Sequence, residues 1–97
     1  MNKPYAIVYD GNIPPEILED LLEVVRSSYV SKKTLNNMLI ISASQFEKAL
    51  EIYKNINSKL KVKSAIFVVS LDNFYGDLMP EAEIWLKETF PSILLIK

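Results

Sequence analysis

The sequence contains no cysteine and no histidine, and each absence removes a class of chemistry. Without cysteine the chain forms no disulfide, carries no thiolate nucleophile and offers no sulfur ligand to zinc or iron. Histidine is the commonest general base and metal ligand, so its absence leaves few side chains for proton transfer near neutral pH. The two glycines, Gly11 and Gly76, are too far apart for a dinucleotide-binding fingerprint or a P-loop. The sequence therefore predicts no cofactor.

A strong excess of one charge and long apolar runs are also missing. The net charge is -1, so the chain as a whole has no electrostatic attraction to nucleic acid or acidic lipid. No apolar run approaches the ~20 residues of a membrane-spanning helix, and residues 1–4 show no signal peptide. We therefore expect a cytoplasmic protein with no membrane partner. Abundant isoleucine and lysine without cysteine are also typical of thermophilic proteins.

Apolar and amphipathic segments alternate along all 97 residues. Hydrophobic residues make up 49% and charged residues 24% of the chain, which is typical of one globular domain, here residues 1–97. Segments with helical periodicity begin near Pro15, after a capping box at Ser44, and at Pro80. Between these helices lie short β-prone segments, namely Tyr5–Tyr9, Met38–Ile41, Ala65–Val69 and Ile93–Ile96.

This β-α-β-α-β-α-β order predicts an architecture. Strands separated by helices pair in parallel, and strands that are apolar on both faces need helices on both sides of the sheet. We predict an α/β fold: a single three-layer domain with a four-stranded, mostly parallel sheet and three helices. The flavodoxin-like strand order 2-1-3-4 is favoured, with 3-2-1-4 as the alternative. The polar segment 28–37 is interpreted as a loop.

Polar side chains follow three of the predicted strands. In an open parallel sheet, ligands bind at the carboxyl ends of the strands, where the strand order reverses. We predict that Asp10 and Asp72 approach each other there, either to hold Mg²⁺ or to act as an acid/base pair. The alternative is that these residues only form turns and helix caps. The candidate ligand or metal cluster comprises Asp10, Asn12, Ser42, Ser70, Asp72 and Asn73.

Basic residues are concentrated in the middle of the chain. Residues 24–63 hold eight lysines and arginines but only two acidic residues. Such a patch attracts phosphates, although lysines near a helix C-terminus also interact favourably with the helix dipole. No aromatic residues are interleaved with these lysines to stack on bases. The candidate nucleic-acid patch comprises Lys54, Lys59, Lys61 and Lys63.

The predicted winding leaves part of one sheet face uncovered. Right-handed crossovers place the first helix on one face and the other two helices on the opposite face, so the third and fourth strands are bare on the first face. Soluble monomers rarely expose an apolar patch of that size. The loop 70–79 is long for an α/β connection, and its aromatic rings either bind a partner or cover the sheet. The candidate interface therefore comprises Phe67, Val69, Phe74, Tyr75, Ile93 and Leu95.

These observations favour a non-enzymatic function. Binding modules need no catalytic constellation, and the sequence contains none. We predict a small cytoplasmic protein-interaction module that forms a homodimer or binds another protein. One alternative is a nucleic-acid-binding accessory protein that uses the lysine-rich middle segment. The other is a Mg²⁺-dependent or acid/base enzyme that uses Asp10 and Asp72.

Overall fold

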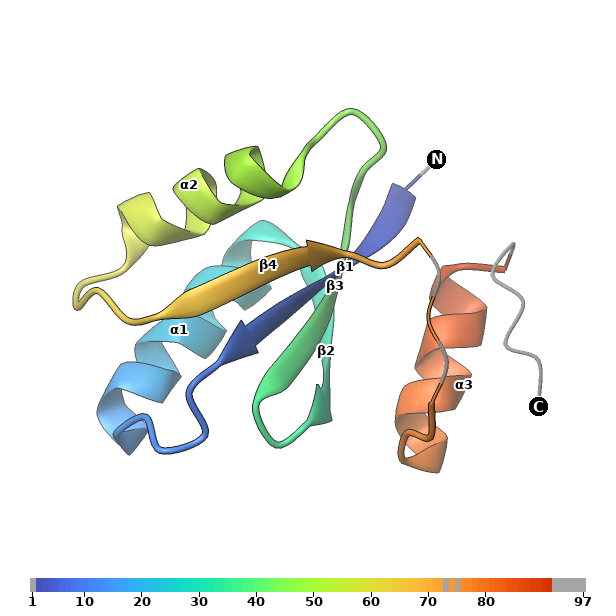
Figure 1. Cartoon of the computed structure of the whole chain (residues 1–97), viewed down its shortest axis with the longest axis horizontal. Helices are drawn as coiled ribbons and strands as arrows, with labels where there is room; N and C mark the ends of the chain where they lie inside the picture. Colours follow the sequence, from blue (N-terminus) through green and yellow to red (C-terminus); the bar gives the residue numbers. More distant parts are fainter. Residues whose placement is uncertain (1, 73, 75, 92–97) are drawn as a thin grey trace.

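A four-stranded antiparallel sheet forms the centre of the protein (Figure 1). The structure is a computed structural model that describes residues 2–72, 74 and 76–91. The sheet order is β2-β3-β1-β4, and each pair of neighbouring strands is antiparallel. The elements in chain order are β1 (Asn2–Tyr9), α1 (Pro15–Ser28), β2 (Val30–Leu35), β3 (Met38–Ser44), α2 (Ala49–Lys59), β4 (Ile66–Ser70) and α3 (Pro80–Thr89).

The predicted parallel, flavodoxin-like sheet is wrong because one strand was interpreted as a loop. Segment 28–37 contains β2, which turns through Asn36 and Asn37 into β3. This hairpin reverses the chain, so β3 and β4 both run opposite to β1. Segments 38–41, 5–9 and 65–69 do lie side by side in that order, but their directions alternate. The predicted strand Ile93–Ile96 lies outside the described residues.

The connections follow the split β-α-β pattern of ferredoxin-like sheets. Helix α1 joins β1 to β2, and β3 lies between these two strands. Helix α2 joins β3 to β4, and β1 lies between them. Each helix thus crosses over one inserted strand, and parallel strands never become neighbours. Ferredoxin-like sheets occur in proteins with many unrelated functions, so this strand order does not identify a function.

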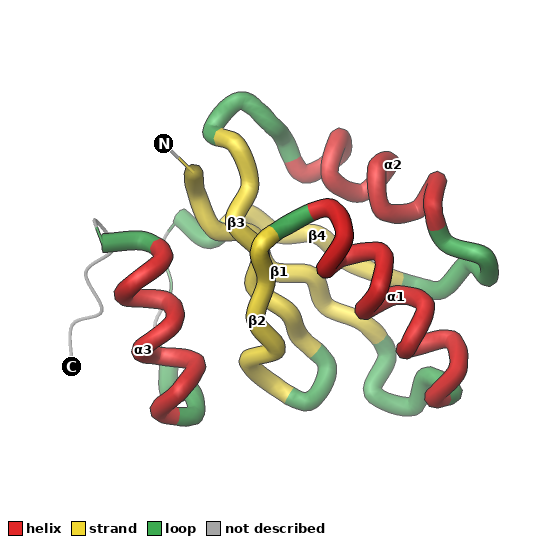
Figure 2. The backbone as a smooth tube through the Cα atoms, turned by 180° about the vertical axis from the view of Figure 1, so that it is seen from behind, coloured by secondary structure: helices red, strands yellow, loops and turns green. Residues whose placement is uncertain are grey.

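Helices α1 and α2 cover one face of the sheet, and α3 lies on the other side (Figure 2). Alternation along β1 directs Tyr5, Ile7 and Tyr9 toward α1 and α2. The helices contribute apolar stripes with helical spacing, among them the fully buried Leu21 and Ile56. The main core of the protein therefore lies between these two helices and the sheet.

A smaller core holds α3 against the opposite face. Its buried members are Ile40 of β3, Leu86 of α3 and Phe90, which directly follows α3. Trp85 packs edge-on against Phe90, with ring centroids 6.0 Å apart. Helix α3 contacts β2, whereas β4 keeps an exposed side chain on this face. The cover on this side of the sheet is therefore uneven.

Tyrosine hydroxyls connect the sheet and the end of α1 to neighbouring segments. The Tyr9 hydroxyl donates to the backbone oxygen of Asn36 over 3.2 Å. The Tyr29 hydroxyl donates to the Glu47 carboxylate over 3.0 Å and accepts from the Asn55 amide over 3.0 Å. Burial raises the pKa of Tyr9 above its ordinary value of 10.0. Burial is also the main cause that raises the pKa of Tyr29, and the Glu47 carboxylate adds to it.

We expect the free energy of unfolding to fall in alkaline solution. A pKa that is higher in the folded state than in the unfolded state contributes stability that is complete below the unfolded pKa, near 10. That stability is lost as the pH rises through the folded pKa of Tyr9 and Tyr29. Urea unfolding at a series of pH values from 8 to 11 measures the decline. The double variant Tyr9→Phe/Tyr29→Phe should decline less steeply, and an equal slope in both proteins would contradict this assignment.

Candidate functional site

The antiparallel register separates the two predicted carboxylates. Asp10 follows the C-terminal end of β1, whereas Ser70 of β4 is opposite Tyr5, near the start of β1. Asp72 extends two residues beyond Ser70, so about seven residues of β1, or roughly 23 Å, separate the two positions. Contrary to the prediction, Asp10 and Asp72 lie at opposite ends of the sheet. The two carboxylates could converge only if β1 and β4 were parallel, and the β2–β3 hairpin makes them antiparallel.

Each described residue of the predicted cluster has a hydrogen-bond partner in the protein. Asp10 accepts from the backbone N–H of Asn12 over 2.9 Å, as in an Asx turn. The Ser42 hydroxyl accepts from the Asn2 amide over 2.9 Å. The Ser70 hydroxyl donates to the Asp72 carboxylate over 3.1 Å.

These contacts are typical of turns and strand ends. Within the described residues, no group of three acidic side chains is placed to hold a metal ion. The predicted Asn73 lies outside the described residues.

The predicted lysine patch lies beside acidic residues. The Lys59 ammonium group donates to the Ser28 hydroxyl over 3.0 Å, and that of Lys63 donates to the backbone oxygen of Asn57. Lys54 is exposed on α2. Lys59 and Lys61 line a groove whose other wall is the acidic side of α1, with Glu16, Glu19, Asp20 and Glu23. These carboxylates lower the positive potential that a nucleic acid would meet.

Within the predicted interface, the described residues have different surroundings. Phe67 is 69% exposed, on the sheet face opposite α1 and α2. Val69, on the same face, is partly buried. Phe74 packs against the small core under α3, so this ring covers the sheet. Tyr75, Ile93 and Leu95 lie outside the described residues.

One edge of the sheet is unpaired along β4. Its inner edge pairs with β1, and among the described residues no strand pairs with its outer edge. The Leu71 N–H donates to the Pro4 oxygen over 3.1 Å, which fixes the alternation of backbone groups along β4. The N–H and C=O groups of Phe67 and Val69 therefore point toward β1. Those of Ile66, Val68 and Ser70 point outward.

The two edge strands differ in how they discourage pairing. Strand β2 carries Lys32 and Lys33, and its register shifts between Lys33 and Leu35. Lysines and irregular pairing are common means of blocking the addition of another strand. Strand β4 contains Ile-Phe-Val-Val-Ser, with no charge, no proline and no register shift against β1. Within residues 2–72, 74 and 76–91 the edge of β4 is thus open to pairing, and that of β2 is not. We call the outer edge of β4 the open edge.

Exposed apolar residues of α2 flank the open edge. Helix α2 packs along β4, with Ile52 and Ile56 facing the core. Asn55 faces the α1 side, where its amide reaches Tyr29. Helical spacing places Leu50 and Tyr53 on the flank away from α1, where they are 61% and 38% exposed. The open edge therefore has apolar side chains above it on α2 and below it at Phe67. The sequence does not predict an unpaired edge at this strand, because the pattern places segment 93–96 beside it; that segment lies outside the described residues.

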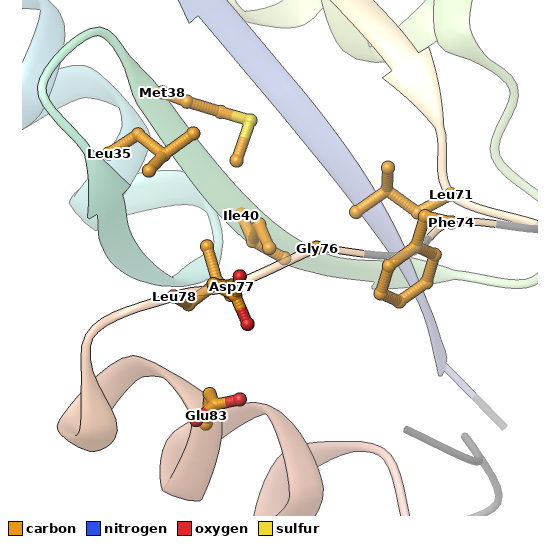
Figure 3. Close-up of a pocket in the computed structure, with 9 residues that line it drawn as sticks. All are labelled: Leu35, Met38, Ile40, Leu71, Phe74, Gly76, Asp77, Leu78 and Glu83. Carbon is orange, nitrogen blue, oxygen red and sulfur yellow. The ribbon is translucent and has the colours of Figure 1, made fainter. Parts of the chain in front are cut away.

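An apolar pocket lies between α3 and the sheet, on the side away from the open edge (Figure 3). Its volume is about 240 Å³. The walls come from the β2–β3 hairpin, from the segment after β4 and from α3. Two carboxylates, of Asp77 and Glu83, line it between the loop and α3. The other lining residues are Leu35, Met38, Ile40, Leu71, Phe74, Gly76 and Leu78.

Comparisons with known proteins give no assignment. No protein-family model, no curated protein and no solved structure matches the chain. In the described part of the chain, no helix combines the length and apolar character needed to cross a membrane. The open edge and the pocket are therefore the features of the chain that bear on its function.

Proposed function

We propose that this protein is a non-enzymatic interaction module of the cytoplasm that self-associates through its open edge. The observation that carries the proposal is the unprotected outer edge of β4 beneath an exposed apolar flank of α2. Unpaired strand edges are templates for pairing with another chain. A second copy is the occupant that fits best, because its own open edge has the same length and the same apolar character.

A two-fold axis at Val68 pairs two copies of β4 in antiparallel fashion. Val68 then lies opposite Val68 of the other copy, and Ile66 lies opposite Ser70. These are the residues whose N–H and C=O groups point outward. Such pairing forms about six hydrogen bonds and joins the two sheets into one continuous sheet.

In the same register, side chains of the two copies also complement each other. Phe67 lies opposite Val69 of the other copy, on the face that α1 and α2 do not cover. The exposed Lys63 precedes β4 and the exposed Asp72 follows it, so each lysine lies near an aspartate of the other copy. Opposite charges at both ends favour this antiparallel register over a shifted one.

Replacing Phe67 by lysine should convert the dimer to a monomer. The substitution puts a charge on the open edge, and it leaves the core intact because Phe67 is 69% exposed. Sedimentation equilibrium distinguishes the 11.1 kDa chain from a dimer of about 22 kDa. Val30→Lys is the matched control: Val30 is 63% exposed on the same face of β2, and this variant should stay dimeric. A monomeric wild-type protein at high micromolar concentration would overturn the proposal.

Charge reversal tests the register itself. Lys63→Glu places two acidic groups at each end of the paired strands, and Asp72→Lys places two basic groups there. Each variant alone should dimerise more weakly than the wild-type protein. An equimolar mixture should form a heterodimer, because every reversed charge then faces its opposite. If the mixture is no more dimeric than its components, the strands pair in a different register.

A further inference from the structure

We propose that the two α2 helices of the dimer pack against each other across the two-fold axis, with Tyr53 in contact with Tyr53 of the other copy. The surface that makes this contact is the side of α2 that faces away from α1. We call it the α2 flank, and it comprises Leu50, Tyr53 and Asn57. The inference rests on the proposed pairing of β4, and it adds a second contact surface to that interface.

The open edge alone is too small to hold two copies together. Stable protein interfaces use roughly 20–30 residues on each side, whereas β4 has five residues. Hydrogen bonds across the edge replace hydrogen bonds to water, so their net contribution is small. Most of the free energy of association must come from apolar surface beside the edge. On one face this surface is Phe67, and on the other it is Leu50 and Tyr53.

The pairing of β4 brings the two α2 helices side by side. The two-fold axis is perpendicular to the sheet, so both helices lie on the same face. Helix α2 lies along β4 (Figure 1), and its Ile52 and Ile56 pack in a core with Tyr5 of β1 and Val68 of β4. It therefore spans two strands, or about one helix width. The axes of the two helices are then about 8–10 Å apart, as in packed helices.

Tyr53 is close to the two-fold axis. The Tyr5 hydroxyl donates to the backbone oxygen of Glu47 over 2.8 Å, and Tyr5 is opposite Ser70. The start of α2 is therefore level with the C-terminal end of β4. From there α2 returns along β4 over roughly the same length, since 11 helical residues and five strand residues both span about 16 Å. The middle of α2, at Tyr53, is thus level with Val68.

The α2 flank has the residue spacing of a helix–helix contact. Its members are at positions i, i+3 and i+7, so they form one row along the helix. In an antiparallel pair this row meets itself in reverse order. Tyr53 then meets its own copy, and Leu50 meets Asn57 of the other copy. Helical spacing places the charged Glu51 and Lys54 outside this row.

The absence of cysteine makes cross-linking a direct test. In Tyr53→Cys the only thiol of each copy lies at the axis, within reach of the thiol of the other copy. We expect mild oxidation to give a covalent dimer in about five-fold higher yield than Ser58→Cys gives. Ser58 is the matched control because it is exposed on the same helix but lies outside the α2 flank. Electrophoresis without reductant measures both yields.

Leu50→Lys tests the apolar contact without a cross-link. Because Leu50 is exposed in the single chain, the substitution leaves the core intact. It should raise the dissociation constant of the dimer about ten-fold, since the contact would bury an unpaired charge. If Phe67→Lys is monomeric while Leu50→Lys dimerises as the wild-type protein does, the helix contact is wrong and the pairing of β4 stands. Equal cross-linking of Tyr53→Cys and Ser58→Cys has the same meaning. A monomeric wild-type protein would overturn both proposals.

Discussion

Replacing Val69 by proline is expected to destabilise the protein by about 3 kcal/mol or more, whereas Val68→Pro should leave it folded and monomeric. Proline removes the backbone N–H at its position and fixes φ near −65°. The N–H of Val69 points toward β1, so its loss removes a hydrogen bond of the β1–β4 ladder. The N–H of Val68 points outward, where a strand edge tolerates proline.

The comparison of the two variants tests which backbone N–H groups of β4 point toward β1. Both positions are in the same strand and start from the same side chain, so strain from the fixed φ is shared. Urea denaturation gives the stability of each variant, and sedimentation gives its association state. Val68→Pro costs some packing, because Val68 contacts the main core. Equal destabilisation of both variants would contradict the assigned alternation along β4, and a dimeric Val68→Pro would contradict pairing through the open edge.

Replacing Leu86 by alanine is expected to lower the free energy of unfolding by about 2–5 kcal/mol. Leu86 has no exposed surface and lies between α3 and Ile40 of β3. Among the residues that the structure describes, the small core under α3 has three buried members, so the neighbouring side chains have limited means to fill the space. Because the main core is on the other side of the sheet, the substitution should chiefly weaken the packing of α3 against the sheet.

Tryptophan fluorescence follows this loss directly. Trp85 is the only tryptophan, and it lies in α3 against Phe90. Its emission should shift to longer wavelength in Leu86→Ala before far-ultraviolet circular dichroism changes. Ile84→Ala is the control: Ile84 is 58% exposed on the same helix, and its loss should cost less than about 0.5 kcal/mol. If α3 and the sheet unfold together at one midpoint in Leu86→Ala, the two cores form a single cooperative unit.

Local patterns in the sequence predict the helices and three of the strands, but not the strand directions. Pro15 and Pro80 do stand at the starts of helices, and apolar runs do mark β1, β3 and β4. The capping box predicted at Ser44 is wrong, because Ser44 ends β3 and α2 begins at Ala49, with Lys48 as its N-cap. The direction of a strand, in contrast, depends on how many times the chain has reversed before it, and the β2–β3 hairpin adds one reversal. Strand β2 has little apolar character because it is an edge strand with lysines. The pair Asn36-Asn37, between Leu35 and Met38, was the available sign of a hairpin turn.

The same omission explains the outcome at the predicted sites. Asp10 and Asp72 could cluster only if the carboxyl ends of both strands lay at the same end of the sheet. A single reversal of the chain therefore separates the two residues. Phe67 is exposed all the same, because helices over one face of a sheet leave the side chains of the other face uncovered in either strand direction. The sequence left open which side chains of this strand face outward. The pocket was not predictable, since residues far apart in sequence meet there only after α3 packs across the sheet.

The unequal edges of the sheet also limit the size of any assembly. A sheet with two open edges has two points of attachment, so each added copy leaves another free end and growth continues as a fibril. Here the lysines and the irregular register of β2 remove one of these points. In the proposed dimer each molecule is then monovalent, and two copies joined at β4 would present only blocked ends. Growth of the proposed assembly would then stop at two copies, which would keep an apolar five-residue strand from becoming a seed for aggregation.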